Sequence, residues 1–220
     1  MANHVDLGFV SETESWRLSS YLFPSKVGGK PAWLSLKSLP TSNDLQCKKC
    51  TEPCLFLLQT YAPWNEKPSC FHRTIFVFVC MNPACCKLND SSNFIVMRSQ
   101  LPKVNDFYAE EPYDEEPPKL GVSYPRAENY QSLCALCGCV GPKSCSRCKA
   151  VSYCSRRHQA MDWKSRHKRM CGSKGDHLLT QVSLHALLNL NGNRLFLRNF
   201  SFGCFSRISN IRRNVQFKSV

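Results

Sequence analysis

Four pairs of cysteine and histidine residues follow one another between residues 134 and 171, and they constrain the fold more than any other feature of the sequence. Their spacings are C-x2-C, C-x2-C, C-x3-H and H-x3-C, formed by Cys134, Cys137, Cys145, Cys148, Cys154, His158, His167 and Cys171. A C-x2-C pair presents two thiolates to one ion, and an x3 pair lies one turn apart on a helix, for which Ser155 is a suitable N-cap. These residues complete two tetrahedral sites with no open position, as in structural zinc sites.

The cysteine content fits the same interpretation. The chain has 15 cysteines among 220 residues, which indicates a disulfide framework in a secreted protein and metal ligands in an intracellular one. The first ten residues lack the basic start and apolar run of a secretory signal, and no stretch reaches the roughly 18 apolar residues of a membrane span. We therefore expect reduced, mostly zinc-bound thiols. Cys139 falls outside the spacing pattern and is expected to be a bystander.

The formal net charge of +13 is unevenly distributed along the chain. An acidic run between residues 105 and 118 contains no Lys or Arg, and its acidic members are Asp106, Glu110, Glu111, Asp114, Glu115 and Glu116. Residues 134–174 reverse this balance, with ten Lys and Arg against a single Asp. The basic block fits a nucleic-acid patch, and it fits equally the solvated surface of a small zinc module.

Composition divides the chain into four segments, and we expect an α+β protein built from small zinc-stabilised modules. Residues 1–104 mix aromatic, apolar and turn residues, which is typical of a β-rich globular domain. Residues 105–131 are rich in acidic residues and proline and predict an exposed linker. Residues 132–175 form the cysteine-histidine finger with short helices, and residues 176–220 form a basic tail of different character.

Two short apolar runs, Leu55–Tyr61 and Thr74–Cys80, predict buried strands in the first segment. A turn is expected at residues 27–31, where paired glycines precede a proline. Trp33, just beyond this turn, is expected to pack in the core rather than to stack on a ligand.

A second group of cysteines brackets the predicted strands. The pairs Cys47-x2-Cys50 and Cys80-x4-Cys85 resemble the two halves of a zinc ribbon, although the gap is long and the second spacing is not x2. Buried or free thiols are the alternative, and Cys86 competes with Cys85 for the fourth position. The residues expected not to bind metal are Cys54, Cys70, Cys204 and His72.

The stretch from Cys134 to Cys171 resembles a MYND zinc finger, including its Tyr153-Cys154-Ser155 and Asp162-Trp163 signatures. The resemblance implies interleaved sites, the first formed by Cys134, Cys137, Cys154 and His158, the second by Cys145, Cys148, His167 and Cys171. Most such fingers have cysteine in place of His158, and imidazole is an equally good zinc ligand. MYND fingers commonly bind proline-containing peptides, which makes Trp163, Gln159 and Ser152 candidate contacts; core packing is the alternative for Trp163.

Further motifs extend the resemblance to most of the chain. They are LGFV near the start, FPSKVGGKPAWL at 23–34, LLQTYAP at 57–63, FHR at 71–73 and QLPKVNDFY at 100–108. Together with the finger they resemble the programmed cell death protein 2 family. This resemblance implies a chaperone that escorts a newly made small-subunit ribosomal protein toward assembly. It also implies association with corepressor proteins through the finger, and presence in both cytoplasm and nucleus.

The resemblance ends near Leu178, where other members continue into a further cysteine-containing domain. The chain is therefore expected to be a C-terminally truncated form, in which full chaperone activity is in doubt. Residues 177–220 are expected to have little structure, with a short amphipathic segment around Leu184, Leu187 and Leu188 as the alternative.

The sequence bears on three classes of function. We expect a zinc-binding protein-interaction adaptor or chaperone, and nucleic-acid binding by the basic finger is the alternative. An enzyme is not expected, because the sequence has no H-E-x-x-H motif, P-loop or nucleophile elbow. The expected zinc sites also leave no open position at which a metal could activate water.

Overall fold

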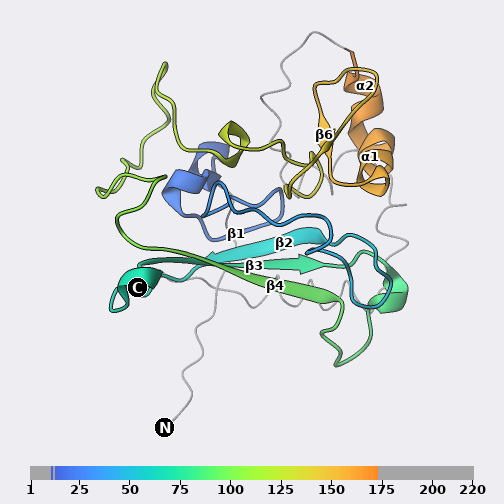
Figure 1. Ribbon diagram of the computed structural model, residues 1–220, viewed down its shortest axis with the longest axis horizontal. Coiled ribbons are helices and arrows are strands. Elements are labelled where there is room, and N and C mark those ends of the chain that lie inside the picture. Colours follow the sequence, from blue (N-terminus) through green and yellow to red (C-terminus); the bar gives the residue numbers. More distant parts are fainter. Residues whose placement is uncertain (1–10, 12, 173–220) are drawn as a thin grey trace.

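A four-stranded antiparallel sheet organises the N-terminal half of the computed structural model, which describes residue 11 and residues 13–172 (Figure 1). The strands lie in the order β1-β2-β3-β4, with bounds Lys26–Val27, Leu55–Tyr61, His72–Val79 and Phe94–Leu101. The predicted strand at Leu55–Tyr61 is confirmed, and the other predicted strand begins two residues earlier than expected. The sequence did not predict β4, because polar residues interrupt its apolar ones.

One face of the sheet carries the core. Burial alternates along β3 from His72 to Phe78, so that His72, Thr74, Phe76 and Phe78 are buried on one face. Trp33 packs over this face, with its ring centroid 4.8 Å from that of Phe76. The expectation that Trp33 lies in the core is therefore confirmed.

The segment that carries Trp33 is fixed by polar side chains from distant parts of the chain. Buried Gln59 on β2 accepts a hydrogen bond from the amide of Ala32 at 2.8 Å and donates to the carbonyl of Pro24 at 2.9 Å. The Tyr108 hydroxyl donates toward the carbonyls of Trp33 and Leu34, at 3.1 and 2.9 Å. Because these buried groups satisfy one another, the position of Trp33 is closely determined.

Residues 105–131 are exposed in their acidic positions and anchored at their aromatic ones. All six acidic residues of the run are exposed. Tyr108, in contrast, is only 5% exposed, and Tyr124 stacks on buried Tyr21 with 4.4 Å between the ring centroids. The carboxylates of this segment are thus exposed, whereas these rings bury apolar area against the N-terminal module.

The finger lies on the side of the sheet that carries Trp33 (Figure 1). It contains a small hairpin of β5 (Lys143–Ser144) and β6 (Ser152–Tyr153), followed by α1 (Arg156–Asp162) and α2 (Lys168–Met170). Residues 163–167 between the two α-helical pieces have π-helical geometry. A π turn changes the rotation per residue, so it re-aims the side chains within it and after it, including that of His167 at its end.

Short 3-10 helices connect these elements, at Ser15–Leu18, Ser20–Leu22, Pro68–Cys70, Pro83–Cys85 and Ala127–Asn129. An antiparallel sheet with few helices agrees with the expected class at a coarse level. No helix within the described residues is long and apolar enough to cross a membrane. The expectations for the tail beyond residue 172 and for Cys204 lie outside the described residues.

Candidate metal centres

The three C-x2-C turns share one backbone conformation. In each, the fourth residue after the first cysteine donates its amide to that cysteine's carbonyl, at 2.9 Å in all three cases. That donor residue has a positive φ each time: Thr51 at 58°, Gly138 at 74° and Lys149 at 56°. The N-terminal turn at Cys47 therefore has the same form as the two turns of the finger, as their shared C-x2-C spacing indicates.

The first group combines the first and third pairs of the finger. The structure brings together one ligand atom each from Cys134, Cys137, Cys154 and His158, all within 4.8 Å of one another. Nδ1 of His158 lies 3.2 Å from Sγ of Cys154 and 3.6 Å from Sγ of Cys134. Sγ of Cys137 lies 3.7 Å from Sγ of Cys154. All four residues are buried.

The second group combines the second and fourth pairs. Cys145, Cys148, His167 and Cys171 also place their ligand atoms within 4.8 Å of one another. Here the histidine presents Nε2, which is 3.5 Å from Sγ of Cys148, and Sγ of Cys145 lies 3.9 Å from Sγ of Cys171. The two histidines of the finger thus face their groups through different ring nitrogens, a difference that sequence spacing could not show.

The third group lies in the N-terminal module and consists of Cys47, Cys50, Cys80 and Cys85. Sγ of Cys50 and Sγ of Cys80 are 3.5 Å apart. Lys49 braces the group from outside, because its ammonium donates to the Cys85 carbonyl at 3.2 Å and pairs with Asp90 at 2.6 Å. The structure brings Cys85, not Cys86, to this group.

These donor sets fit zinc in their chemistry and in their dimensions. Zinc is held by thiolate and imidazole, and tetrahedral bonds of about 2.3 Å to sulfur and about 2.0–2.1 Å to nitrogen place neighbouring donors roughly 3.5–3.8 Å apart. The donor separations of 3.2–3.9 Å given above bracket that range. Bound zinc would supply cross-linking between elements that few apolar contacts hold together.

Backbone amides favour the thiolate form of the leading cysteine in two of the turns. The amide of Cys148 makes the largest contribution to lowering the pKa of Cys145 to about 6, against an opposing contribution from burial. Burial opposes ionisation of Cys47, but the amides of Cys50 and Lys49, together with the neighbouring thiols, lower its pKa to about 7. A thiolate prepared in this way is the form that binds metal.

The helix of the finger begins as the sequence predicts. Ser155 is the N-cap of α1, and its hydroxyl accepts a hydrogen bond from the amide of His158 at 3.1 Å. Cys154 precedes the helix and Cys171 follows it, so the x3 pairs straddle the two helix ends and do not lie within a helix as we expected. The tight turn at each end still places both members of a pair in one group.

Asp162, the first residue of the Asp162-Trp163 signature, has a clear structural role. Asp162 is buried and accepts a hydrogen bond from the hydroxyl of Tyr153 at 2.7 Å. Arg166 lies 3.3 Å from the other carboxylate oxygen. A buried carboxylate needs such partners, so Asp162 ties the helix to β6 between the two metal groups.

The remaining candidates occupy varied positions. His72 is a buried residue at the start of β3, paired with the Tyr61 hydroxyl at 2.8 Å, and belongs to none of the three groups. Burial raises the pKa of Cys54 to about 12, and Cys70 is also buried.

The expected peptide contacts are all partly exposed: Trp163, Gln159 and Ser152. Trp163 also packs against the core cluster, so both of its expected roles remain open.

Comparisons with known proteins identify the families of both parts of the chain. The profile of the programmed cell death protein 2 N-terminal domain matches residues 4–115, and that of the MYND finger matches residues 134–171. Programmed cell death protein 2 of Bos taurus is 47% identical over 189 residues, covering 85% of this chain and 53% of the relative. The protein of the same name from Rattus norvegicus is 45% identical over 189 residues, covering 84% and 52%.

The finger also recurs in another setting, because ubiquitin carboxyl-terminal hydrolase 19 of Arabidopsis thaliana is 55% identical over 38 residues, or 17% of this chain and 6% of that protein. No solved structure matches the chain. The chain spans about half the length of the programmed cell death protein 2 relatives it matches. It binds zinc through its MYND finger, and it belongs to the programmed cell death protein 2 family.

Proposed function

We propose that this chain is a zinc-dependent adaptor or chaperone that escorts a newly made small-subunit ribosomal protein. In this proposal it holds three zinc ions, two in the finger and one at Cys47, Cys50, Cys80 and Cys85. Its finger contacts corepressor proteins through proline-containing peptides, and the chain acts in both cytoplasm and nucleus.

The donor sets support a structural role for the metal. Each group offers four cysteine or histidine ligands. In every group at least three of the four residues are buried. A four-ligand set of this kind leaves no position for a substrate or an activated water. We therefore propose a binding role rather than catalysis.

The observation that carries the proposal is an acidic surface on a fixed support. The six carboxylates of residues 106–116 are exposed, while Tyr108 and Tyr113 between them are held against the N-terminal module. An ordered negative surface attracts cationic segments and selects against anionic ones. Ribosomal proteins are rich in such cationic segments because they bind RNA.

Affinity capture from translating cells tests this role. The full chain should recover one nascent small-subunit ribosomal protein, and a quadruple variant (Asp106→Asn, Glu110→Gln, Glu111→Gln, Glu116→Gln) should recover at least about tenfold less, because each lost charge weakens steering and complementarity. Exposed Glu66 and Glu128 lie outside the acidic run, so their double substitution to Gln is the matched control. Equal recovery with both variants would contradict the proposal.

The same experiment addresses the finger and the tail. Trp163→Ala should reduce recovery of corepressor proteins and leave the ribosomal client, with Lys164→Ala as an exposed neighbour control. A chain ending at residue 176 should still capture the client if the described residues carry the binding surface. Recovery of corepressors alone would move the function to the finger.

Nucleic-acid binding is the second candidate, favoured by the exposed basic residues of the finger. Lys143, Arg147, Lys149, Lys164 and Lys168 are exposed, whereas Arg157 is paired with Glu52 at 2.7 Å. Charge alone gives binding that weakens steeply with salt and ignores sequence. Tight, sequence-selective binding at physiological salt would favour this candidate over the adaptor.

A further inference from the structure

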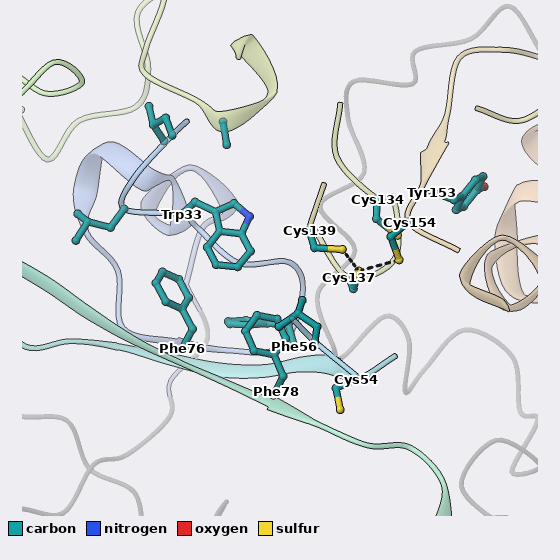
Figure 2. Close-up of a cluster of buried hydrophobic side chains, with 14 of the residues drawn as sticks. Trp33, Cys54, Phe56, Phe76, Phe78, Cys134, Cys137, Cys139, Tyr153 and Cys154 are labelled. Carbon is teal, nitrogen blue, oxygen red and sulfur yellow. Dashed lines mark hydrogen bonds between the residues drawn. The ribbon is translucent and has the colours of Figure 1, made fainter. Parts of the chain in front are cut away.

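The first metal group has a buried neighbour that the spacing pattern excludes. Cys139 is 0% exposed, and its Sγ lies 3.1 Å from Sγ of Cys137. This is closer than the 3.7 Å between Cys137 and Cys154 within the group itself. Figure 2 shows the three sulfurs in one chain of contacts, Cys139 to Cys137 to Cys154. Cys139 is therefore adjacent to the donors, and the expectation that it is a mere bystander does not explain its position.

The backbone around Cys139 is held from both sides. Its carbonyl accepts the amide of Cys134 at 2.7 Å, and the amide of the next residue, Val140, donates to the Pro40 carbonyl at 3.0 Å. On the other side, the carbonyl of Gly138 accepts the indole N–H of Trp33 at 2.7 Å. The Cys139 thiol is thus presented to the group by a fixed loop, which the N-terminal module clamps (Figure 2).

The second group has no comparable neighbour in the part of the chain that the structure describes. The sulfur contacts of Cys145, Cys148 and Cys171 run to members of their own group. Within the first group, the extra thiol lies closest to Cys137 and also interacts with Cys154, whereas Cys134 contacts His158. An additional donor therefore exists beside the Cys137 side of one group.

We propose that Cys139 is a reserve ligand of the first metal group and takes the place of Cys137 when that thiolate is lost. This rests on the proposed zinc site. In the exchange, the sulfur of Cys139 releases its proton to water as it binds the ion, and the leaving Cys137 sulfur takes up a proton. No electron is transferred, and the ion keeps three sulfurs and one imidazole nitrogen, so its coordination number is unchanged.

Alanine variants of the full chain test the proposal, with Cys134→Ala as the matched control because Cys134 adjoins no spare thiol in the described residues. Zinc content per chain is measured on each purified variant. The sulfur-to-metal charge-transfer absorption of the cobalt-loaded protein then reports the number of bound thiolates. Cys137→Ala should keep the wild-type metal content and absorption. Cys134→Ala and the double variant Cys137→Ala/Cys139→Ala should each lose one ion, and Cys139→Ala alone should lose none.

Competition with a chromophoric chelator supplies a second measurement, the affinity of each variant for the ion. The affinity of the weakened ion should fall less than about tenfold in Cys137→Ala, within the range expected for a repositioned ligand, and more than a hundredfold in Cys134→Ala. Loss of the ion in Cys137→Ala to the same extent as in Cys134→Ala would overturn the reserve-ligand proposal while leaving the zinc site intact. Full metal content in Cys134→Ala would instead show that this group holds no metal, and would overturn both.

Discussion

The sheet of the N-terminal module and the finger are stabilised by different kinds of buried residue. The sheet buries large apolar side chains such as Trp33, Phe56, Phe76 and Phe78. The finger has almost none, and its buried residues are chiefly cysteine and histidine, with Tyr153 as the one large ring. About 40 residues cannot bury enough apolar surface to fold alone, so the finger depends on metal in a way that the sheet does not.

The comparison also shows where the two parts depend on each other. One continuous cluster of buried residues runs from the sheet into the first metal group. Trp33 belongs to the sheet core and also donates its indole N–H to the finger. The metal therefore holds the finger, and the sheet holds the loop that carries part of the first metal group.

Removing a zinc ligand should affect the finger most. Cys145→Ser breaks the second donor set, and the binding energy of a structural site is on the order of 10 kcal/mol. We expect the finger to unfold at 25 °C while the sheet keeps its circular dichroism signal. Loss of one zinc per chain by elemental analysis would accompany this, and a folded finger with full zinc content would contradict it.

Truncating a side chain of the sheet core should destabilise the sheet rather than the finger. Phe76 is 1% exposed beneath Trp33, so Phe76→Ala should lower the free energy of unfolding of the sheet by about 3–5 kcal/mol. Chemical denaturation measures this. Val96→Ala on the exposed face of β4, where the side chain is 64% exposed, is the control, and it should change stability by less than about 0.5 kcal/mol.

Two glycine substitutions measure how much the contact between the finger and the N-terminal module contributes to stability. Gly138 has a φ of +74°, and a Cβ there would lie 2.7 Å from Cδ of Pro31. Gly121 has a φ of +80° with nothing within 4 Å of such a Cβ. Both alanine substitutions strain the backbone, but only Gly138→Ala also creates a clash with Pro31 of the N-terminal module. It should therefore lower the free energy of unfolding by about 1–3 kcal/mol more than Gly121→Ala, measured by thermal unfolding. Equal losses would show that the contact contributes nothing.

Much of this arrangement could be predicted from the residues themselves. The ordered spacing of the finger pairs and the apolar run at Leu55–Tyr61 carry strong local signals, and both the donor groups and β2 agree with them. The missed features depend on distant contacts. β4 gains its place by pairing along β3. Cys139 could not be placed because its neighbour Gly138 is fixed by Trp33, 105 positions earlier.

His72 should add a small pH effect to the stability of the sheet. Burial lowers the pKa of His72 below its ordinary value of 6.5, so the folded state disfavours the imidazolium form. The unfolded state then binds more protons below pH 6.5, and the sheet loses stability as the pH falls through that range. His72→Gln should reduce the slope of the unfolding free energy against pH relative to wild type, measured by denaturation between pH 7 and 5. An unchanged slope would contradict this assignment.

Hydrogen exchange of the full chain, with and without a strong zinc chelator, tests the division between the two parts most directly. Without zinc, the amides of residues 134–171 should lose protection. The amides of β2, β3 and β4 that are hydrogen-bonded within the sheet should keep most of their protection. Loosening of the loops around Cys47 and Cys85 should accompany this. Equal protection of the finger in both conditions, or loss of protection throughout the sheet, would contradict the account.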